Sequence, residues 1–189
     1  MEQEIKLAFE DIEAARRAVQ AAGARLDISA RLIDDQLFDT PDAQLRRAGT
    51  GLRVRRDGAR TFLTYKGPVQ PGPVKSREEL ETEVADAGIV EGIVRGLGFQ
   101  PAFRGQKRRE EYRLDTTHVM IDETPMGIFI EIEGDPAAIA RAAAALGRSE
   151  RDYRLESYPT LWRDWCARTG QGDARAMLFD APSQAPSEA

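Results

Sequence analysis

The sequence predicts an α+β protein in which an antiparallel sheet has one apolar face and one charged face. Several segments alternate apolar with charged residues, which is the side-chain period of a β-strand. Other segments repeat apolar residues at the spacing of an amphipathic helix, and clusters of glycine and proline separate the two kinds. Helices of this kind cover the apolar face of a sheet, so we expect both in one layered domain.

The first third of the sequence predicts strands and helices in alternation. In chain order we expect a strand over 2–9, a helix over 12–22, an extended stretch over 25–39, a short helix over 43–48 and a hairpin over 51–66. Asp11 is a suitable N-cap for the first helix, and Gly23 is a suitable end. Asp57 and Gly58 form the pair of residues that is typical of a tight hairpin turn.

The remaining sequence predicts one further strand after a loop, and then a mixture of helices and strands. We expect a loop over 67–75, a strand over 76–84, a helix over 86–97, strands near 106–113, 118–122 and 128–133, a helix over 136–146 and a last helix from 158. The apolar residues of the helix after Asp86 are expected to form one stripe, namely Ile89, Val90, Ile93, Val94 and Leu97. Periodicity ends near Gly170, so we expect one domain over residues 1–170 and a disordered tail over 171–189.

The composition is that of an ordinary globular protein with a strongly charged surface. Hydrophobic residues make up 41% of the chain, charged residues make up 31%, and the formal net charge is −5. A negative net charge disfavours a general nucleic-acid surface, which needs a basic face. No apolar run approaches the length of a membrane span, and no secretory leader is recognisable. We therefore expect a cytoplasmic protein with no nucleic-acid partner and no membrane partner.

The scarcity of cysteine and histidine limits the chemistry of any metal site. Cys166 is the single cysteine and His118 the single histidine, so the sequence excludes an intramolecular disulfide, a cysteine-ligated zinc site and a histidine cluster within one chain. A metal ion must then be held by carboxylates, which favour Mg²⁺ or Mn²⁺.

The charged faces of the predicted strands contain sets of residues with the same sign. Arg53 and Arg55 alternate on one strand, and Glu131 and Glu133 alternate on another. Such neighbours repel one another, and a solvent-exposed sheet gains nothing from them. Two arrangements remain open: an open sheet with a solvated charged face, and a sheet closed into a barrel whose charges point into the lumen.

A barrel with a charged lumen requires partners for its ions, because an unpaired buried charge costs several kcal/mol. A polyphosphate with metal ions is a partner of the right kind. Lysine and arginine neutralise phosphate oxygens, and paired carboxylates hold Mg²⁺ while phosphates and water complete its octahedron.

Several blocks of the sequence together resemble those of a known superfamily. Glu2, Glu4 and Lys6 form an ExExK pattern, which is weak evidence alone because it is short. It is followed in order by FDTPDAQL, LRVRR, TYKGP, SREELETE, KRREEY and FIEIE, with a weaker match at ESYPTLW. The sequence from Glu2 to Glu133 thereby resembles the CYTH superfamily, the triphosphate tunnel metalloenzymes, which include thiamine triphosphatases, inorganic triphosphatases and class IV adenylyl cyclases.

The resemblance implies an eight-stranded antiparallel β-barrel, or tunnel, with helices packed outside and a triphosphate and a divalent metal inside. It implies the following roles: catalytic residues Glu2, Glu4 and Lys6; triphosphate ligands Lys6, Arg53, Arg55, Lys66, Arg77, Lys107 and Arg109; metal ligands Glu2, Glu4, Asp122, Glu131 and Glu133; and supporting residues Glu79 and Glu81. The expected cofactor is Mg²⁺ or Mn²⁺ and the expected partner is a small-molecule triphosphate, with a homodimer left open.

Other polar and aromatic residues are interpreted as structural. We expect Lys75 and Arg108 to be solvated, and Tyr158, Trp162 and Trp165 to be packing anchors.

The shared motifs bind the triphosphate and do not separate three activities. We place a triphosphatase first, because attack by water needs no bound ribose. A class IV adenylyl cyclase, which converts ATP to cyclic AMP and pyrophosphate, is the alternative. A polyphosphate- or nucleotide-binding module without turnover is the third interpretation, but a pure anion binder would gain from losing its carboxylates.

Overall fold

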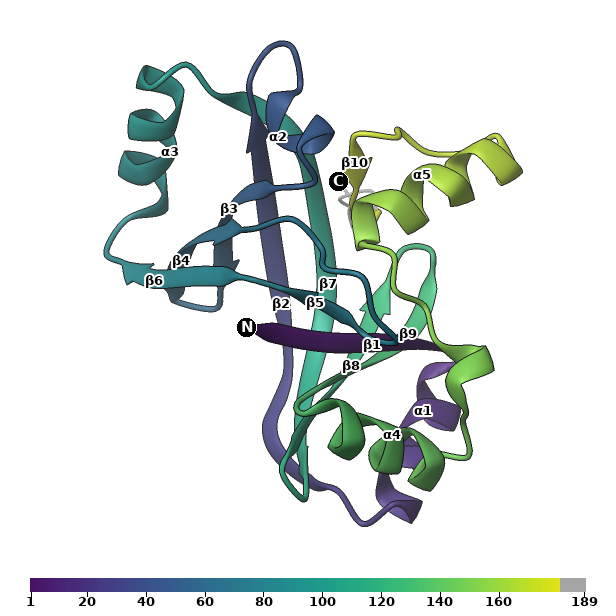
Figure 1. Cartoon of the computed structure of the whole chain (residues 1–189). Coiled ribbons are helices and arrows are strands. Elements are labelled where there is room, and N and C mark those ends of the chain that lie inside the picture. The colour runs from purple at the N-terminus through teal and green to yellow at the C-terminus, as the bar shows by residue number, and fades with distance from the viewer. Residues whose placement is uncertain (181–189) are drawn as a thin grey trace, which may run out of the picture.

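The strands of the protein belong to one sheet, which the computed structural model describes over residues 1–180 (Figure 1). In chain order the elements are β1 (Glu2–Phe9), α1 (Ile12–Ala21), β2 (Arg25–Asp39), α2 (Gln44–Arg47), β3 (Gly51–Asp57), β4 (Arg60–Lys66), β5 (Lys75–Arg77), β6 (Glu79–Val84), α3 (Ala87–Gly96), β7 (Gln100–Leu114), β8 (Thr117–Thr124), β9 (Gly127–Glu133), α4 (Pro136–Ala145), a short 3₁₀ turn (Glu150–Asp152), α5 (Tyr158–Thr169) and β10 (Ala176–Met177).

Local sequence signals explain where these elements begin and end. Asp11 accepts a hydrogen bond of 2.6 Å from the backbone N–H of Ala14 and so caps α1, as predicted. The β3–β4 hairpin pairs Asp57 with Arg60 and turns through Gly58 at φ +59°, a left-handed conformation that glycine adopts without strain.

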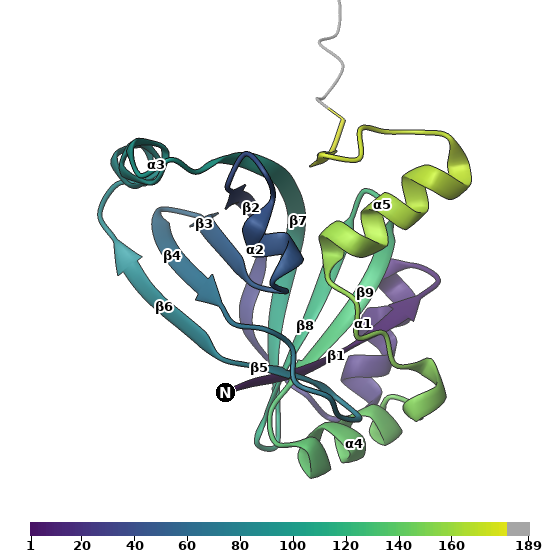
Figure 2. The ribbon, with the colours of Figure 1, turned by 45° about the horizontal axis from the view of Figure 1, so that its top comes forward.

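The sheet curls into a nearly closed antiparallel barrel, which confirms the predicted tunnel architecture (Figure 2). Neighbouring strands follow the order β5-β1-β9-β8-β7-β2-β3-β4-β6. β5 pairs with β1 and β6 pairs with β4, yet only Glu78 separates β5 from β6 along the chain. One continuous segment therefore joins the two edges of the sheet.

Residues 1–180 contain ten strands where the resemblance implied eight. The predicted strand over 76–84 is split at Glu78, whose carbonyl accepts a hydrogen bond of 2.9 Å from Gly67 N, as the chain passes from one sheet edge to the other. The second additional strand is β10, which pairs in parallel with β7.

Helices cover the outer, apolar face of the barrel in two places. The largest cluster lies between α1, α4 and the strands β1, β8 and β9, and includes Ile5, Leu7, Ile121, Ile130 and Ile139. A second cluster lies under α3. A third cluster, of Phe103, Trp162 and Met177, joins β7 to α5 and β10 on the cavity side of the sheet. Within residues 1–180 no helix is both long and apolar enough to cross a membrane.

Helix α3 buries only part of the apolar stripe that the sequence predicts. Val90 and Val94 pack on Phe38 and Val54, whereas Ile93 is 58% exposed and Leu97 is 72% exposed. The stripe is only partly buried, because a single short helix presents only one of its sides to β3 and β4.

The folded domain extends beyond the predicted boundary at residue 170. Met177 is buried, and Trp162 Nε1 donates a hydrogen bond of 2.7 Å to the carbonyl of Asp173. Residues 171–180 are therefore part of the domain, because aromatic anchors on α5 and the edge of β7 hold them. The rest of the predicted tail, residues 181–189, lies outside the described residues.

Candidate active site

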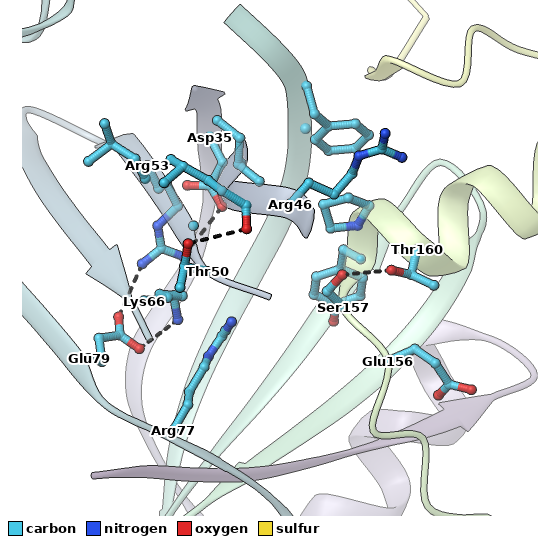
Figure 3. A pocket seen from close by; sticks show the side chains of 18 of the residues that line it. Asp35, Arg46, Thr50, Arg53, Lys66, Arg77, Glu79, Glu156, Ser157 and Thr160 are labelled. Carbon is cyan, nitrogen blue, oxygen red and sulfur yellow. Dashed lines mark hydrogen bonds and ion pairs between the residues drawn. The ribbon is translucent and has the colours of Figure 1, made fainter. Parts of the chain in front are cut away.

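The barrel encloses a cavity of about 1230 Å³, lined by the inward-facing side chains of its strands and by residues of α2 and α5 (Figure 3). The alternation of β-strands directs every second residue into this space, while the residues between them pack outward under the helices. The inner part of the cavity holds charged side chains of both signs, which form three connected groups.

The first group is a chain of ion pairs along β1, β5 and β9. Lys6 Nζ lies 3.0 Å from Glu4 Oε1 and 3.1 Å from Glu131 Oε1. Burial opposes the charge of Lys6, but the carboxylates of Glu4 and Glu131 outweigh it and raise the pKa of the ammonium. Lys6 is thus a buried, fixed cation between two carboxylates.

Lys75 also belongs to this first group, although we expected it to be solvated. Its side chain is 4% exposed, and its Nζ lies 2.6 Å from Glu4 Oε1. Burial and the neighbouring Lys6 ammonium lower the pKa of Lys75 to about 8. Lys75 has the same parity as Arg77 along the strand, and this alternation was the signal that could have identified it.

The second group surrounds Asp122, whose side chain is fully buried. Arg109 donates two hydrogen bonds of 2.6 Å to its carboxylate, and Lys107 Nζ lies 2.8 Å from Oδ2. Arg109 also pairs with Glu131, which links this group to the first.

Tyr158, at the start of α5, is part of the second group rather than only a packing anchor. Its hydroxyl donates a hydrogen bond of 2.7 Å to Asp122 Oδ2, and its ring centroid lies 4.8 Å from Lys107 Nζ and 5.3 Å from Lys6 Nζ. Burial and then the charges of Asp122 and Glu131 raise the pKa of its hydroxyl well above the ordinary value, so it remains a donor. The sequence contains no signal for this contact, because the hydrogen bond joins α5 to β8, which is distant along the chain.

The third group lies on the opposite wall, on β2, β3, β4 and β6 (Figure 3). Arg55 donates two hydrogen bonds, of 2.7 and 2.8 Å, to Asp35, a carboxylate that our sequence analysis did not single out. Arg53 lies 3.2 Å from Glu81 and 3.5 Å from Glu79.

The N-terminal end of β1 connects the third group to the first. Lys66 Nζ lies 2.8 Å from Glu2 and 2.5 Å from Glu79, and Arg77 Nε lies 2.9 Å from Glu2. Register explains this, since Glu2 pairs with Arg77 between β1 and β5 and Lys66 pairs with Glu79 between β4 and β6.

Three glutamates could hold a hard metal ion. One carboxylate oxygen from each of Glu2, Glu4 and Glu133 lies within 4.8 Å of the others. Among the described residues no cation lies within ion-pair distance of Glu133. Burial, and then the negative charges of Glu131, Glu4 and Glu2, raise the pKa of its carboxyl to about 7. Repelling carboxylates that converge in a buried site are a set of oxygen ligands that fits a divalent cation.

The five predicted metal ligands are therefore divided in the structure. Glu2, Glu4 and Glu133 gather, whereas Asp122 and Glu131 accept ion pairs from lysine and arginine. All seven predicted triphosphate ligands and both supporting glutamates line the cavity, namely Lys6, Arg53, Arg55, Lys66, Arg77, Lys107, Arg109, Glu79 and Glu81. Arg108 faces outward as expected and pairs with Glu123 at 3.1 Å.

The raised pKa of Glu133 predicts how the stability of the metal-free protein depends on pH. The folded carboxyl keeps its proton to about pH 7, whereas an ordinary glutamate loses it near 4.5, so between these values the folded state binds more protons. The free energy of unfolding should then fall as pH rises, by roughly 2 to 3 kcal/mol between about pH 5 and about pH 8.

Urea unfolding with EDTA at both pH values tests this dependence. Glu133→Gln carries no titrating carboxyl and should lose that part of the decrease. An equal decrease in the variant would show that Glu133 is not the group responsible.

The fold and the charged lining of the cavity together define a class of protein. It is a triphosphate tunnel protein, in which a nearly closed antiparallel barrel encloses paired charges. The chain belongs to the CYTH domain family, whose model matches residues 1–157. Members of this family are enzymes that act on small-molecule triphosphates.

Individual relatives agree with this assignment. A Methanocaldococcus jannaschii protein named "putative adenylate cyclase" is 30% identical over 134 residues, which cover 70% of this chain and 76% of the relative. A Pyrococcus horikoshii structure is 26% identical with a TM-score of 0.71, covering 84% of this chain and 97% of that one. A Hippeastrum structure, named a "putative adenylyl cyclase" with a dominant triphosphatase activity, shares the fold at 20% identity and a TM-score of 0.67, covering 87% of this chain and 96% of that one.

Proposed function

We propose that the protein is a divalent-metal-dependent triphosphatase that cleaves the terminal phosphate from a triphosphate bound in the tunnel. The observation that carries this proposal is the acidic group of Glu2, Glu4 and Glu133 within a continuous network of lysine and arginine side chains that line the cavity. Such a network suits a polyanion, and such an acidic group suits Mg²⁺ or Mn²⁺.

The charge balance of the lumen supports the joint binding of anion and metal. Eight cationic side chains, Lys6, Arg53, Arg55, Lys66, Lys75, Arg77, Lys107 and Arg109, face eight carboxylates, Glu2, Glu4, Asp35, Glu79, Glu81, Asp122, Glu131 and Glu133. A triphosphate alone would leave this buried space strongly negative, which is costly. Divalent cations that enter with the triphosphate restore the balance, so we expect metal and substrate to bind cooperatively.

The side chains have distinct roles in this proposal. Lys6, held between Glu4 and Glu131, would contact the phosphate that is transferred, together with Arg109 and Lys107. Arg53 Nε is buried and has no hydrogen-bond acceptor among residues 1–180, so it has a donor left for a phosphate oxygen. Fixed cations at these positions stabilise charge that develops on the non-bridging oxygens.

Glu2, Glu4 and Glu133 would hold the metal, with Glu79 and Glu81 supporting Lys66 and Arg53. A bound divalent cation supplies a Lewis acid and lowers the pKa of a water molecule.

A class IV adenylyl cyclase is the second candidate, because the Methanocaldococcus jannaschii relative is named as an adenylate cyclase. In that case the 3′-hydroxyl of ATP, rather than water, attacks the α-phosphate. The carboxylates of the tunnel disfavour the third interpretation, a binding module without turnover. A site that only binds an anion has a higher affinity when its charges are all positive.

One assay separates these activities. Purified protein with Mg²⁺ or Mn²⁺ is given tripolyphosphate, thiamine triphosphate or ATP, and the products are quantified. We expect phosphate release that EDTA abolishes. Cyclic AMP with pyrophosphate would instead identify a cyclase, and tight binding without either product would identify a binding module.

A further inference from the structure

The outer part of the cavity differs chemically from the charged inner part. Its walls include the apolar residues Leu37, Pro101, Phe103 and Met177 beside polar residues such as Thr40, Thr50 and Ser157. A triphosphate consists of charged oxygens and gains nothing from such walls. This outer part is therefore suited to a substrate that carries an additional, less polar group.

Three arginines also line this outer part, and they lack the partners that the inner cations have. Arg46 on α2, Arg163 on α5 and Arg175 before β10 have no carboxylate within ion-pair distance in the described part of the chain. Figure 3 shows Arg46 reaching across the opening towards the side of Ser157 and Thr160. Arg163 donates a hydrogen bond of 3.3 Å to Thr160 Oγ1, and within residues 1–180 its side chain makes no other hydrogen bond.

The segment that supplies two of these arginines follows the part of the chain that matches the family model, which ends at residue 157. It is nevertheless held firmly. Trp162 is buried and stacks on Trp165 at 4.8 Å, and the backbone N–H of Arg104 donates a hydrogen bond of 2.9 Å to the carbonyl of Arg175. The wall formed by α5 and β10 is thus a preformed surface.

The chemistry of this wall selects among organic groups. Guanidinium groups stack on planar aromatic rings, and apolar side chains pack against them. The same three positive charges repel a cation such as the thiazolium of thiamine. Asp39 and Glu156 also line the cavity and offset two of these three charges, so the five groups together keep a net positive charge.

We propose that Arg46, Arg163 and Arg175, with the apolar wall of Leu37, Phe103 and Met177, bind the base of a nucleoside triphosphate. This inference rests on the proposed function in that the triphosphate occupies the inner cavity. It assigns the substrate class as nucleoside triphosphates, in preference to inorganic triphosphate and thiamine triphosphate. It holds for hydrolysis and for cyclisation alike.

The experiment compares ATP with tripolyphosphate in the wild type and in the triple variant R46Q/R163Q/R175Q. Loss of positive charge at the rim weakens the attraction for tripolyphosphate, the more highly charged anion, at least as much as for ATP, so a larger loss for ATP isolates contacts with the base. We expect the KM for ATP to rise about tenfold more than the KM for tripolyphosphate. Arg168→Gln, an exposed change on the same helix outside the cavity, serves as the charge control and should leave the ratio unchanged.

Calorimetric binding of ATP and tripolyphosphate with Ca²⁺, another divalent ion that takes oxygen ligands, in place of Mg²⁺ gives a second readout that does not depend on turnover. The same excess loss of ATP affinity is expected in the triple variant. Equal losses for both ligands, or a wild-type preference for tripolyphosphate or thiamine triphosphate, would overturn the inference. Absence of metal-dependent turnover of every triphosphate would instead contradict the proposed function, and the calorimetric ratio would still test the base site.

Discussion

Replacement of Glu133 by alanine is expected to lower metal-dependent turnover at least about a hundredfold, because even partners of metal ligands contribute ten- to a hundredfold. The acidic group would lose the carboxylate that has no cationic partner within residues 1–180, and with it the ligand most available to a divalent ion. Glu2 and Glu4 would remain paired with lysine and arginine. Turnover measured over a range of Mg²⁺ and Mn²⁺ concentrations would show both a lower rate and a higher metal requirement.

Glu83→Ala is the matched control, since it removes one glutamate from a strand of the same barrel. Glu83 follows Glu79 and Glu81 along β6 but does not line the cavity, and it pairs with Arg60 at 2.7 Å with half of its side chain exposed. Its loss should leave turnover and metal requirement unchanged. If Glu133→Ala had the same metal requirement as the wild type, Glu133 would not be a ligand.

Asp122→Ala is expected to destabilise the fold by about 3 to 5 kcal/mol, the usual cost of breaking a buried ion pair from one side. The change leaves Lys107 and Arg109 with Glu131 as their remaining carboxylate and removes the acceptor of the Tyr158 hydroxyl. Urea unfolding in EDTA measures this loss directly.

The neighbouring residue provides the comparison for this second prediction. Glu123 pairs with Arg108 on the outer face of the same strand, where the arginine side chain is 52% exposed. Glu123→Ala should therefore cost less than about 1 kcal/mol. Similar losses in both variants would mean that the network around Asp122 contributes no more than a surface pair.

Alternation made most of the fold and of the lumen predictable. The charged set on β1, the arginines of β3 and the glutamates of β9 could be assigned to one face because a strand has a period of two. Closure of the barrel could not be derived in this way, since an open sheet has the same pattern. The prediction of a closed barrel came from the resemblance. In the structure, the predicted strand over 76–84 divides at Glu78 into β5 and β6, which lie at the two edges of the sheet and join them.

The errors came from contacts between parts of the chain that are distant in sequence. Tyr158 lies on a helix, and nothing in its neighbourhood along the chain indicates that Asp122 accepts its hydrogen bond. Asp35 becomes a partner only because β2 and β3 pair in the register that sets it beside Arg55. The exposed half of α3 likewise depends on how that helix lies on the barrel, which periodicity does not determine.

The short pairing of β5 with β1 has a consequence for the charge of the acidic group. It comprises the register pairs Glu2 with Arg77, Gln3 with Ser76 and Glu4 with Lys75, whereas the β1–β9 pair sets Glu4 opposite Glu133. With this seam unpaired, Glu2 and Glu4 would still lie beside Glu133 but would lose the ion pairs with Arg77 and Lys75. Completion of the ring thus supplies counter-charges to carboxylates that two other strands already hold together.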